Sequence, residues 1–342
     1  MSIILALPTP IASSSTVQQD YNPNPPDHMV KLIFTHHSTG ENWLRDDYGG
    51  PGHALAANNY FVSDTNYGRG PDSIGDRTDI PIWTVWFSGE KTPVTVKAVF
   101  NESGQNSSYT RLPDDPGGEN QIIMFKSCFP KSALEVSPDD SPSADDWLTV
   151  GHAKYVYNKI LQYFATRPDK LFIIITAPPL SDPTYAENTR AFNQWLVKDW
   201  LDENNYTLPN VAVFDFYNVI TASDAHHRYS NGILEHTYGR SNTLAYPSSD
   251  DHASQAGSRK ATEEFLPLLN IYYHLWADGL ISQHPAAVLP TAATQPSTPA
   301  TSQITEPPAT TPEPDGHGNS LPCLGSIITL ALLGAVRTFR LK

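Results

Sequence analysis

One serine early in the chain and one histidine late in it have the surroundings of a nucleophile and its general base. Ser38 follows the apolar run 29–35 after His36 and His37, at a point where a turn from strand to helix can expose a hydroxyl. His252 lies in an acidic loop directly before a helical pattern, next to Asp250 and Asp251. A histidine can accept the proton of a serine hydroxyl, and a carboxylate on its other ring nitrogen fixes the required tautomer. These residues therefore predict attack of a serine on an acyl group.

The segments around this pair predict a parallel sheet that brings the two residues together. Continuous apolar runs, which are typical of strands buried on both faces, occupy 29–35, 121–125, 171–176 and 211–216. Apolar residues at helical spacing occupy 150–166, 185–202 and 254–276, while 92–100 fits either a strand or a helix. Strands that alternate with helices imply an α/β fold class, here a three-layer α/β/α domain with a central parallel sheet. In such sheets the ligand lies at the carboxyl ends of the strands, where Ser38 is found.

The order of these motifs resembles that of the SGNH, or GDSL-type, hydrolase superfamily. The likeness rests on the early serine, the late Asp/His pair before the last helix, and the segments 173–181 and 188–196, and it covers about 31–269. It implies an SGNH/flavodoxin-like fold and hydrolysis of carboxylic esters, with Ser38 as the nucleophile and His252 as the base. It also implies an oxyanion donor near Gly68, with Gly75 as the other choice.

The nucleophile and acid motifs of this chain differ from the superfamily pattern. His-His-Ser at 36–38 replaces Gly-Asp-Ser. Ser249 stands three residues before His252, where the pattern has its acid, so the role of the acid falls to Asp250 or Asp251. Ser38 itself could also be a helix N-cap rather than a nucleophile.

The third block differs as well. It reads Lys-Ser-Cys-Phe at 126–129 and has no oxyanion asparagine, so this position falls to Ser127, Cys128, Lys126 or no residue. Cys128 is either a small packed thiol or an alternative nucleophile that works with His252.

Two further kinds of function stay open on the same residues. The histidine pairs 36–37 and 226–227, with Asp64, Asp76 and Asp79, could hold a divalent metal that activates water. Adjacent histidines in an extended segment point to opposite faces, and no HExxH pattern occurs, so no metal ligand and no cofactor is assigned. The altered third block also fits a non-catalytic, glycan-binding surface protein on the same fold.

The composition argues against a nucleic-acid partner. The chain of 342 residues has 22 Lys and Arg against 36 Asp and Glu, which gives a formal net charge of −14. Binding to a polyanion needs clustered cations, and the only basic run is the short tail 337–342. The two cysteines, Cys128 and Cys323, are too few for a disulfide framework.

The two ends of the chain predict export and attachment to a surface. We expect a signal-peptide remnant and leader at 1–25, the SGNH hydrolase-like domain at 26–280, and a Pro/Thr-rich stalk at 281–320. The segment 321–342 is a short apolar anchor or sorting signal with a basic end. Glycosylation sequons at Asn101, Asn106 and Asn205 agree with an extracellular, membrane-anchored or cell-wall-attached protein.

Together these features predict a secreted or surface-anchored serine hydrolase. The expected substrate is a carbohydrate or related small ester, from which the enzyme would remove an acyl group. A carbohydrate is expected as the substrate because of the expected surface location and because members of the superfamily commonly act on such esters.

Overall fold

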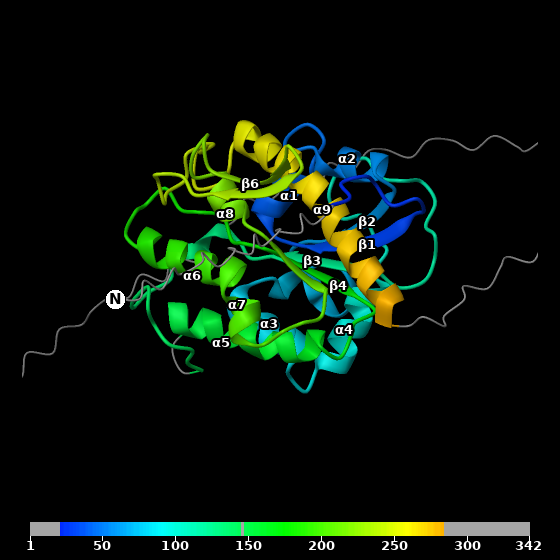
Figure 1. Ribbon diagram of the computed structural model, residues 1–342, viewed down its shortest axis with the longest axis horizontal. Helices are drawn as coiled ribbons and strands as arrows, with labels where there is room; N and C mark the ends of the chain where they lie inside the picture. The colour runs from blue at the N-terminus through cyan, green and yellow to red at the C-terminus, as the bar shows by residue number, and fades with distance from the viewer. Residues whose placement is uncertain (1–20, 145–146, 284–342) are drawn as a thin grey trace, which may run out of the picture. The chain divides into compact units, whose positions relative to one another are not determined.

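A five-stranded parallel sheet forms the centre of the domain in the computed structural model, which describes residues 21–144 and 147–283 (Figure 1). The strands lie in the order β2-β1-β3-β4-β5, and every neighbouring pair is parallel. Their bounds are Val30–Thr35 (β1), Tyr60–Thr65 (β2), Ile122–Lys126 (β3), Leu171–Ile175 (β4) and Val211–Phe214 (β5). The predicted α/β fold class is confirmed.

Helices cover both faces of this sheet, which gives three layers (Figure 1). One face carries α3 (Trp83–Phe87), α4 (Thr92–Asn101), α5 (Val150–Phe164), α6 (Ala186–Lys198) and α7 (Trp200–Glu203). The other carries α1 (Ser38–Leu44), α2 (Pro51–Ala57), α8 (Phe216–Val219) and α9 (Gln255–Gln283). Because strand side chains alternate between faces, Ile33 packs in the first layer and Phe34 in the second.

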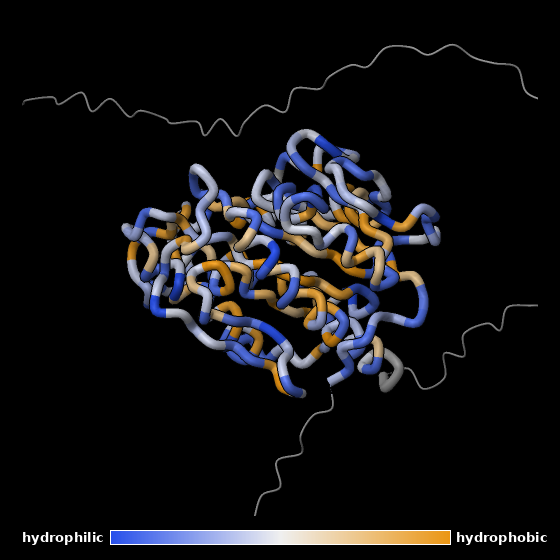
Figure 2. The backbone as a smooth tube through the Cα atoms, turned by 90° about the horizontal axis from the view of Figure 1, so that it is seen from above, coloured by the Kyte–Doolittle hydropathy of each residue, from blue (hydrophilic) through white to orange (hydrophobic). Residues whose placement is uncertain are grey.

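Both sides of the sheet have an apolar core, and the polar residues lie mainly on the outside (Figure 2). In α5 the predicted stripe of Val156, Ile160 and Phe164 is buried, as expected for an amphipathic helix on a sheet. None of the helices in the described ranges is long and apolar enough to cross a membrane.

Among the elements that were not assigned from the sequence are α4 and β2. The ambiguous segment 92–100 forms the helix α4, which starts with Pro93 in its first turn and buries Val96, Val99 and Phe100. β2 gave no signal because Ser63, Asp64 and Thr65 interrupt its apolar character, although all three are buried.

Shorter elements join these layers near the carboxyl ends of the strands. They are the 3₁₀ turns η1 (Pro71–Arg77), η2 (Ile80–Ile82) and η3 (Phe129–Ser132), and an antiparallel hairpin of β6 (His226–Ser230) and β7 (Ile233–Thr237). The hairpin packs against α8 and α9. The segments 1–20 and 284–342 lie outside the described residues, so the leader, the stalk and the anchor stay predictions.

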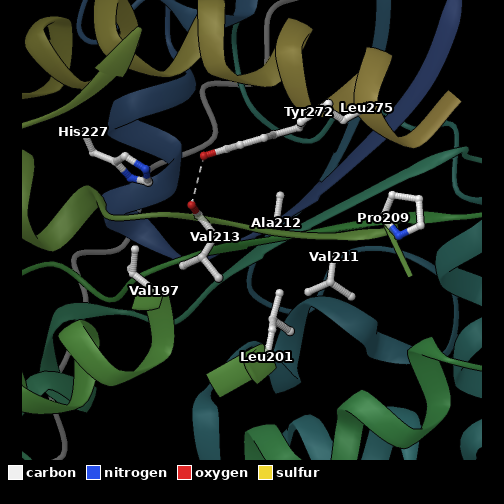
Figure 3. A pocket seen from close by; sticks show the side chains of 9 residues that line it. All are labelled: Val197, Leu201, Pro209, Val211, Ala212, Val213, His227, Tyr272 and Leu275. Carbon is white, nitrogen blue, oxygen red and sulfur yellow. Dashed lines mark hydrogen bonds between the residues drawn. The ribbon is translucent and has the colours of Figure 1, made fainter. Parts of the chain in front are cut away.

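The outer edge of β5 borders a hollow of about 440 Å³ between α7 and α9 (Figure 3). Its walls are mainly aliphatic, with Leu201 on one side and Leu275 on the other. The Tyr272 hydroxyl reaches across and donates to the Val213 carbonyl at 3.1 Å. His227, from one of the histidine pairs considered for a metal, lines this hollow, whereas Ser38, His252 and Asp250 do not.

Candidate active site

Ser38 is the first residue of α1, and two residues separate it from the end of β1. The turn forms because the extended His37 begins the helix, and its carbonyl accepts the N–H groups of Gly40 at 2.7 Å and Glu41 at 3.0 Å. At position 40 only glycine fits, since a Cβ there would lie 2.3 Å from the His36 side chain. The tight turn places the serine at the carboxyl edge of the sheet.

The two histidines before Ser38 brace this turn. His36 is fully buried, with Nε2 at 3.2 Å from an Asp64 carboxylate oxygen. His37 donates from Nε2 to the Gly75 carbonyl at 3.0 Å, and its ring stacks on Tyr67 with centroids 4.2 Å apart. Burial lowers the pKa of His37 to about 4, so this ring is neutral at neutral pH.

One histidine of each pair contacts a carboxylate, His36 with Asp64 at 3.2 Å and His226 with Glu264 at 2.8 Å. Asp64, for example, also accepts the Ser107 hydroxyl at 2.6 Å and the Tyr109 hydroxyl at 3.1 Å. Within residues 21–144 and 147–283, no group of three or more His, Cys, Asp or Glu side chains is placed to hold a metal ion.

His252 lies against Ser38, although 214 positions separate the two residues. Its Nε2 is 2.8 Å from Ser38 Oγ, and its Nδ1 is 2.9 Å from Asp250 Oδ1. A hydrogen bond holds the loop that carries His252, because the Tyr48 hydroxyl donates to the Ala253 carbonyl at 2.8 Å. The ring edge of Phe129 packs on the imidazole with centroids 4.9 Å apart. The structure therefore brings the predicted serine, histidine and aspartate into one hydrogen-bonded chain.

The two candidate acids of this loop have different partners. Asp250 Oδ1 accepts both Nδ1 and the backbone N–H of His252, the latter at 3.0 Å. Partial burial raises the pKa of Asp250, but the His252 hydrogen bonds outweigh it and hold the pKa below its usual value. Asp251 instead accepts the Ser181 N–H at 2.7 Å. Asp250 is thus the carboxylate that can orient the imidazole.

Gly68 and Gly75, the predicted oxyanion donors, have other partners in the structure. The Gly68 N–H donates to the Asp76 carboxylate, and the Gly75 N–H donates to the Arg69 carbonyl at 3.0 Å. A Cβ at Gly75 would lie 1.9 Å from the Asn66 carbonyl oxygen, so close packing of the loop explains this glycine. The expectation that either N–H group serves an oxyanion finds no support in this geometry.

The altered third block lies directly beside the serine. Cys128 Sγ is 3.6 Å from Ser38 Oγ and 3.9 Å from Thr39 Oγ1, and the residue is only 4% exposed. The buried Ser127 hydroxyl has no hydrogen-bond partner in the part of the chain that is described. Cys128 therefore occupies the wall of the site next to the nucleophile.

Two charged groups lie beside this wall, the buried Lys126 and the partly buried Asp79; the sequence named Lys126 only as one choice for the oxyanion position and Asp79 only for a metal site. Burial lowers the pKa of the Lys126 ammonium to about 8 and raises the pKa of the Asp79 carboxyl to about 6. A lysine at the end of an otherwise apolar strand is the sequence signal for such a buried ammonium.

Comparisons with known proteins give only distant similarities. No family model and no curated protein matches the chain. One similar structure is a family two carbohydrate esterase from Cellvibrio japonicus, 12% identical over 73% of this chain and 63% of that one, with a TM-score of 0.33. A second is a carbohydrate esterase whose active site is described as having divergent catalytic and non-catalytic binding functions. It is 11% identical over 73% of this chain and 68% of that one, with a TM-score of 0.34. Similarities this low say nothing about the chemistry of the present chain.

Proposed function

We propose that this protein is a serine esterase or deacylase of the SGNH type that acts on a carbohydrate or related ester. The observation that carries the proposal is the chain of contacts from Ser38 Oγ to His252 Nε2, 2.8 Å, and from His252 Nδ1 to Asp250, 2.9 Å. Both distances are those of hydrogen bonds through which a serine can be activated. The order of the motifs along the chain gives independent support.

The arrangement suits a two-step acyl transfer. Ser38 Oγ attacks the ester carbonyl while His252 Nε2 takes its proton, and Asp250 holds the Nδ1–H tautomer and balances the imidazolium charge. When the tetrahedral intermediate collapses, the C–O bond to the alcohol breaks and His252 gives its proton to the leaving oxygen. A water molecule, deprotonated by His252, then attacks the acyl-serine, the bond from Ser38 Oγ to the acyl carbon breaks, and His252 returns the proton to Ser38 Oγ as the acid leaves.

An exposed aromatic ring beside the nucleophile supports the carbohydrate part of the proposal. Tyr67 stacks on His37, the residue before Ser38, and is 44% exposed. A flat apolar ring with a polar edge is suited to contact with a sugar ring. Trp83, Trp86 and Phe87 are not available for this role, because all three are buried in the core.

Labelling with a fluorophosphonate tests the proposal directly. We expect the probe to form one adduct, on the peptide that carries Ser38, and to stop hydrolysis of 4-nitrophenyl acetate. Ser38→Ala should abolish both the adduct and turnover, whereas Ser230→Ala in the β6–β7 hairpin should change neither. An adduct on another residue, or full turnover in Ser38→Ala, would contradict the proposal.

We further propose that the enzyme works outside the cell, tethered by its C-terminal segment. Support comes from the composition of 281–320 and 321–342 and from the signal-like start, all of which lie mainly or wholly outside the described residues. The membrane or cell wall would then be the attachment partner.

A further inference from the structure

A buried lysine and a partly buried aspartate hold one peptide unit beside Ser38. The Lys126 ammonium donates to the Ser127 carbonyl at 3.0 Å, and an Asp79 carboxylate oxygen accepts the Cys128 N–H at 3.2 Å. The Ser127 carbonyl and the Cys128 N–H belong to the same peptide plane. A cation therefore lies at the negative end of that peptide dipole and an anion at its positive end. We name this pair of contacts the Lys126–Asp79 clamp.

The two residues of the clamp come from different parts of the fold. Lys126 is the last residue of β3, in the middle of the sheet, and Asp79 directly precedes η2. Asp79 is 49 positions from Cys128, so the contact depends on tertiary packing. Lys131 on η3 lies 3.8 Å from the other Asp79 oxygen and completes the surroundings of the carboxylate.

The clamp is costly for stability, which argues for a role in function. Lys126 has no exposed surface, and no described carboxylate oxygen lies within 4.0 Å of its ammonium. Burial shifts the pKa values of both groups toward their neutral forms, to about 8 for Lys126 and about 6 for Asp79. A methionine in place of the lysine would avoid the desolvation of an ammonium at nearly the same volume.

The residues on and after the clamped peptide contact both Ser38 and His252. Cys128 Sγ lies 3.6 Å from Ser38 Oγ, and the next residue, Phe129, packs on the His252 ring. A displacement of this peptide would move both the wall beside the nucleophile and the support of the base. Misplacement by about 1 Å can lower a reaction rate about 100-fold.

We propose that Lys126 and Asp79 are positioning residues, which fix the Ser127–Cys128 peptide so that Cys128 forms a rigid wall beside Ser38 Oγ during acyl transfer. The inference rests on the proposed function of Ser38. In this proposal no residue directly replaces the third-block asparagine. Lys126 and Asp79 instead hold the segment 126–129 that stands in its place.

The test measures both the freedom of Cys128 and turnover in the full-length protein. Alkylation of Cys128 by iodoacetamide is followed by mass spectrometry of its peptide, and kcat and KM are measured with 4-nitrophenyl acetate. We expect Lys126→Met and Asp79→Ala to raise the Cys128 alkylation rate severalfold and to lower kcat about tenfold or more, with little change in KM. Asp79→Asn keeps an acceptor for the Cys128 N–H and should restore most of kcat.

Lys170→Met is the matched control. Lys170 is also nearly buried, but it lies next to the amino end of β4 and pairs with Glu119 at 2.8 Å, so neither readout should change. Unchanged alkylation in both Lys126→Met and Asp79→Ala, or faster alkylation with normal kcat, would overturn the inference. A wild-type protein without a Ser38 adduct would overturn the proposed function instead, and the alkylation rates would still decide whether the clamp holds Cys128.

Discussion

His252 is the residue on which the proposed reaction depends most, because its ring links Ser38 to Asp250. We expect His252→Ala to lower kcat by about 10²–10⁴, the usual contribution of a general base. The midpoint of thermal unfolding should change little, since His252 lies in a loop before α9 and takes no part in the apolar core.

The control for this prediction is His274→Ala. His274 lies on α9, where its Nε2 contacts the Asn24 carbonyl at 3.1 Å. Its substitution by alanine should leave kcat unchanged. Turnover of His252→Ala at the wild-type rate would rule out this histidine as the base.

Single residues of the site differed in how far the sequence could predict them. Ser38 and His252 were predictable because each lies at a fixed place in a motif, after a strand or before a helix. The contact of Asp79 with Cys128 was not, because a loop of irregular backbone brings Asp79 there. The oxyanion role of Gly68 and Gly75 came from motif position alone, and the actual loop uses both N–H groups internally.

At the scale of elements, continuous burial decided what could be predicted. β1, β3 and β4 are buried on both faces, and their apolar runs identified them. The polar strand β2 was missed because its buried Asp64 is satisfied by hydrogen bonds from Ser107 and Tyr109, distant partners that no local pattern reveals. The β6–β7 hairpin was missed for a similar reason, since its fastening contacts are polar.

The β6–β7 hairpin is fastened by a buried carboxylate at the end of β5. Asp215 accepts from His236 Nε2 at 2.9 Å and caps α8 by accepting the Asn218 N–H at 3.1 Å. We expect Asp215→Ala to lower the free energy of unfolding by about 3–5 kcal/mol, because it breaks a buried pair. Urea unfolding measures the loss. Glu235→Ala in the same hairpin removes a partly exposed pair with Arg228 and should cost at most about 1 kcal/mol.

The same carboxylate makes stability depend on pH. Burial raises the pKa of Asp215, but the His236 hydrogen bond and the charges of His236, His227 and Arg190 together hold the pKa below its usual value. A carboxyl with a lowered folded-state pKa stabilises the fold above its unfolded pKa of about 4, and this contribution is lost as the pH falls below it. The difference in unfolding free energy between wild type and Asp215→Ala should therefore shrink in acid. A difference that grew below pH ~4 would contradict the assignment.

At the scale of the whole molecule, the parallel topology explains how distant motifs form one site. β1 lies between β2 and β3, so the turn after β1 opens at the carboxyl edge between the loops that follow β2 and β3. α9 crosses the same layer as α1, and this brings the loop before α9 onto Ser38. The fold could be predicted because the topology follows from alternating strands and helices, whereas the loops that line the site could not.

The last prediction concerns the boundary of the folded unit. The described chain ends with α9, whose Phe265, Leu268 and Leu269 are fully buried against the sheet, so a chain that ends at Gln283 keeps every described core residue. We expect this shortened protein to be monodisperse, to unfold cooperatively and to hydrolyse esters at the full-length rate. The full chain, which retains the apolar segment 321–336, should instead fractionate with membranes or the cell wall. If that segment were part of the core, its removal would expose apolar surface and cost several kcal/mol, enough to unfold a marginally stable domain. Aggregation of the shortened protein would therefore place 321–336 in the fold and reject its role as an anchor.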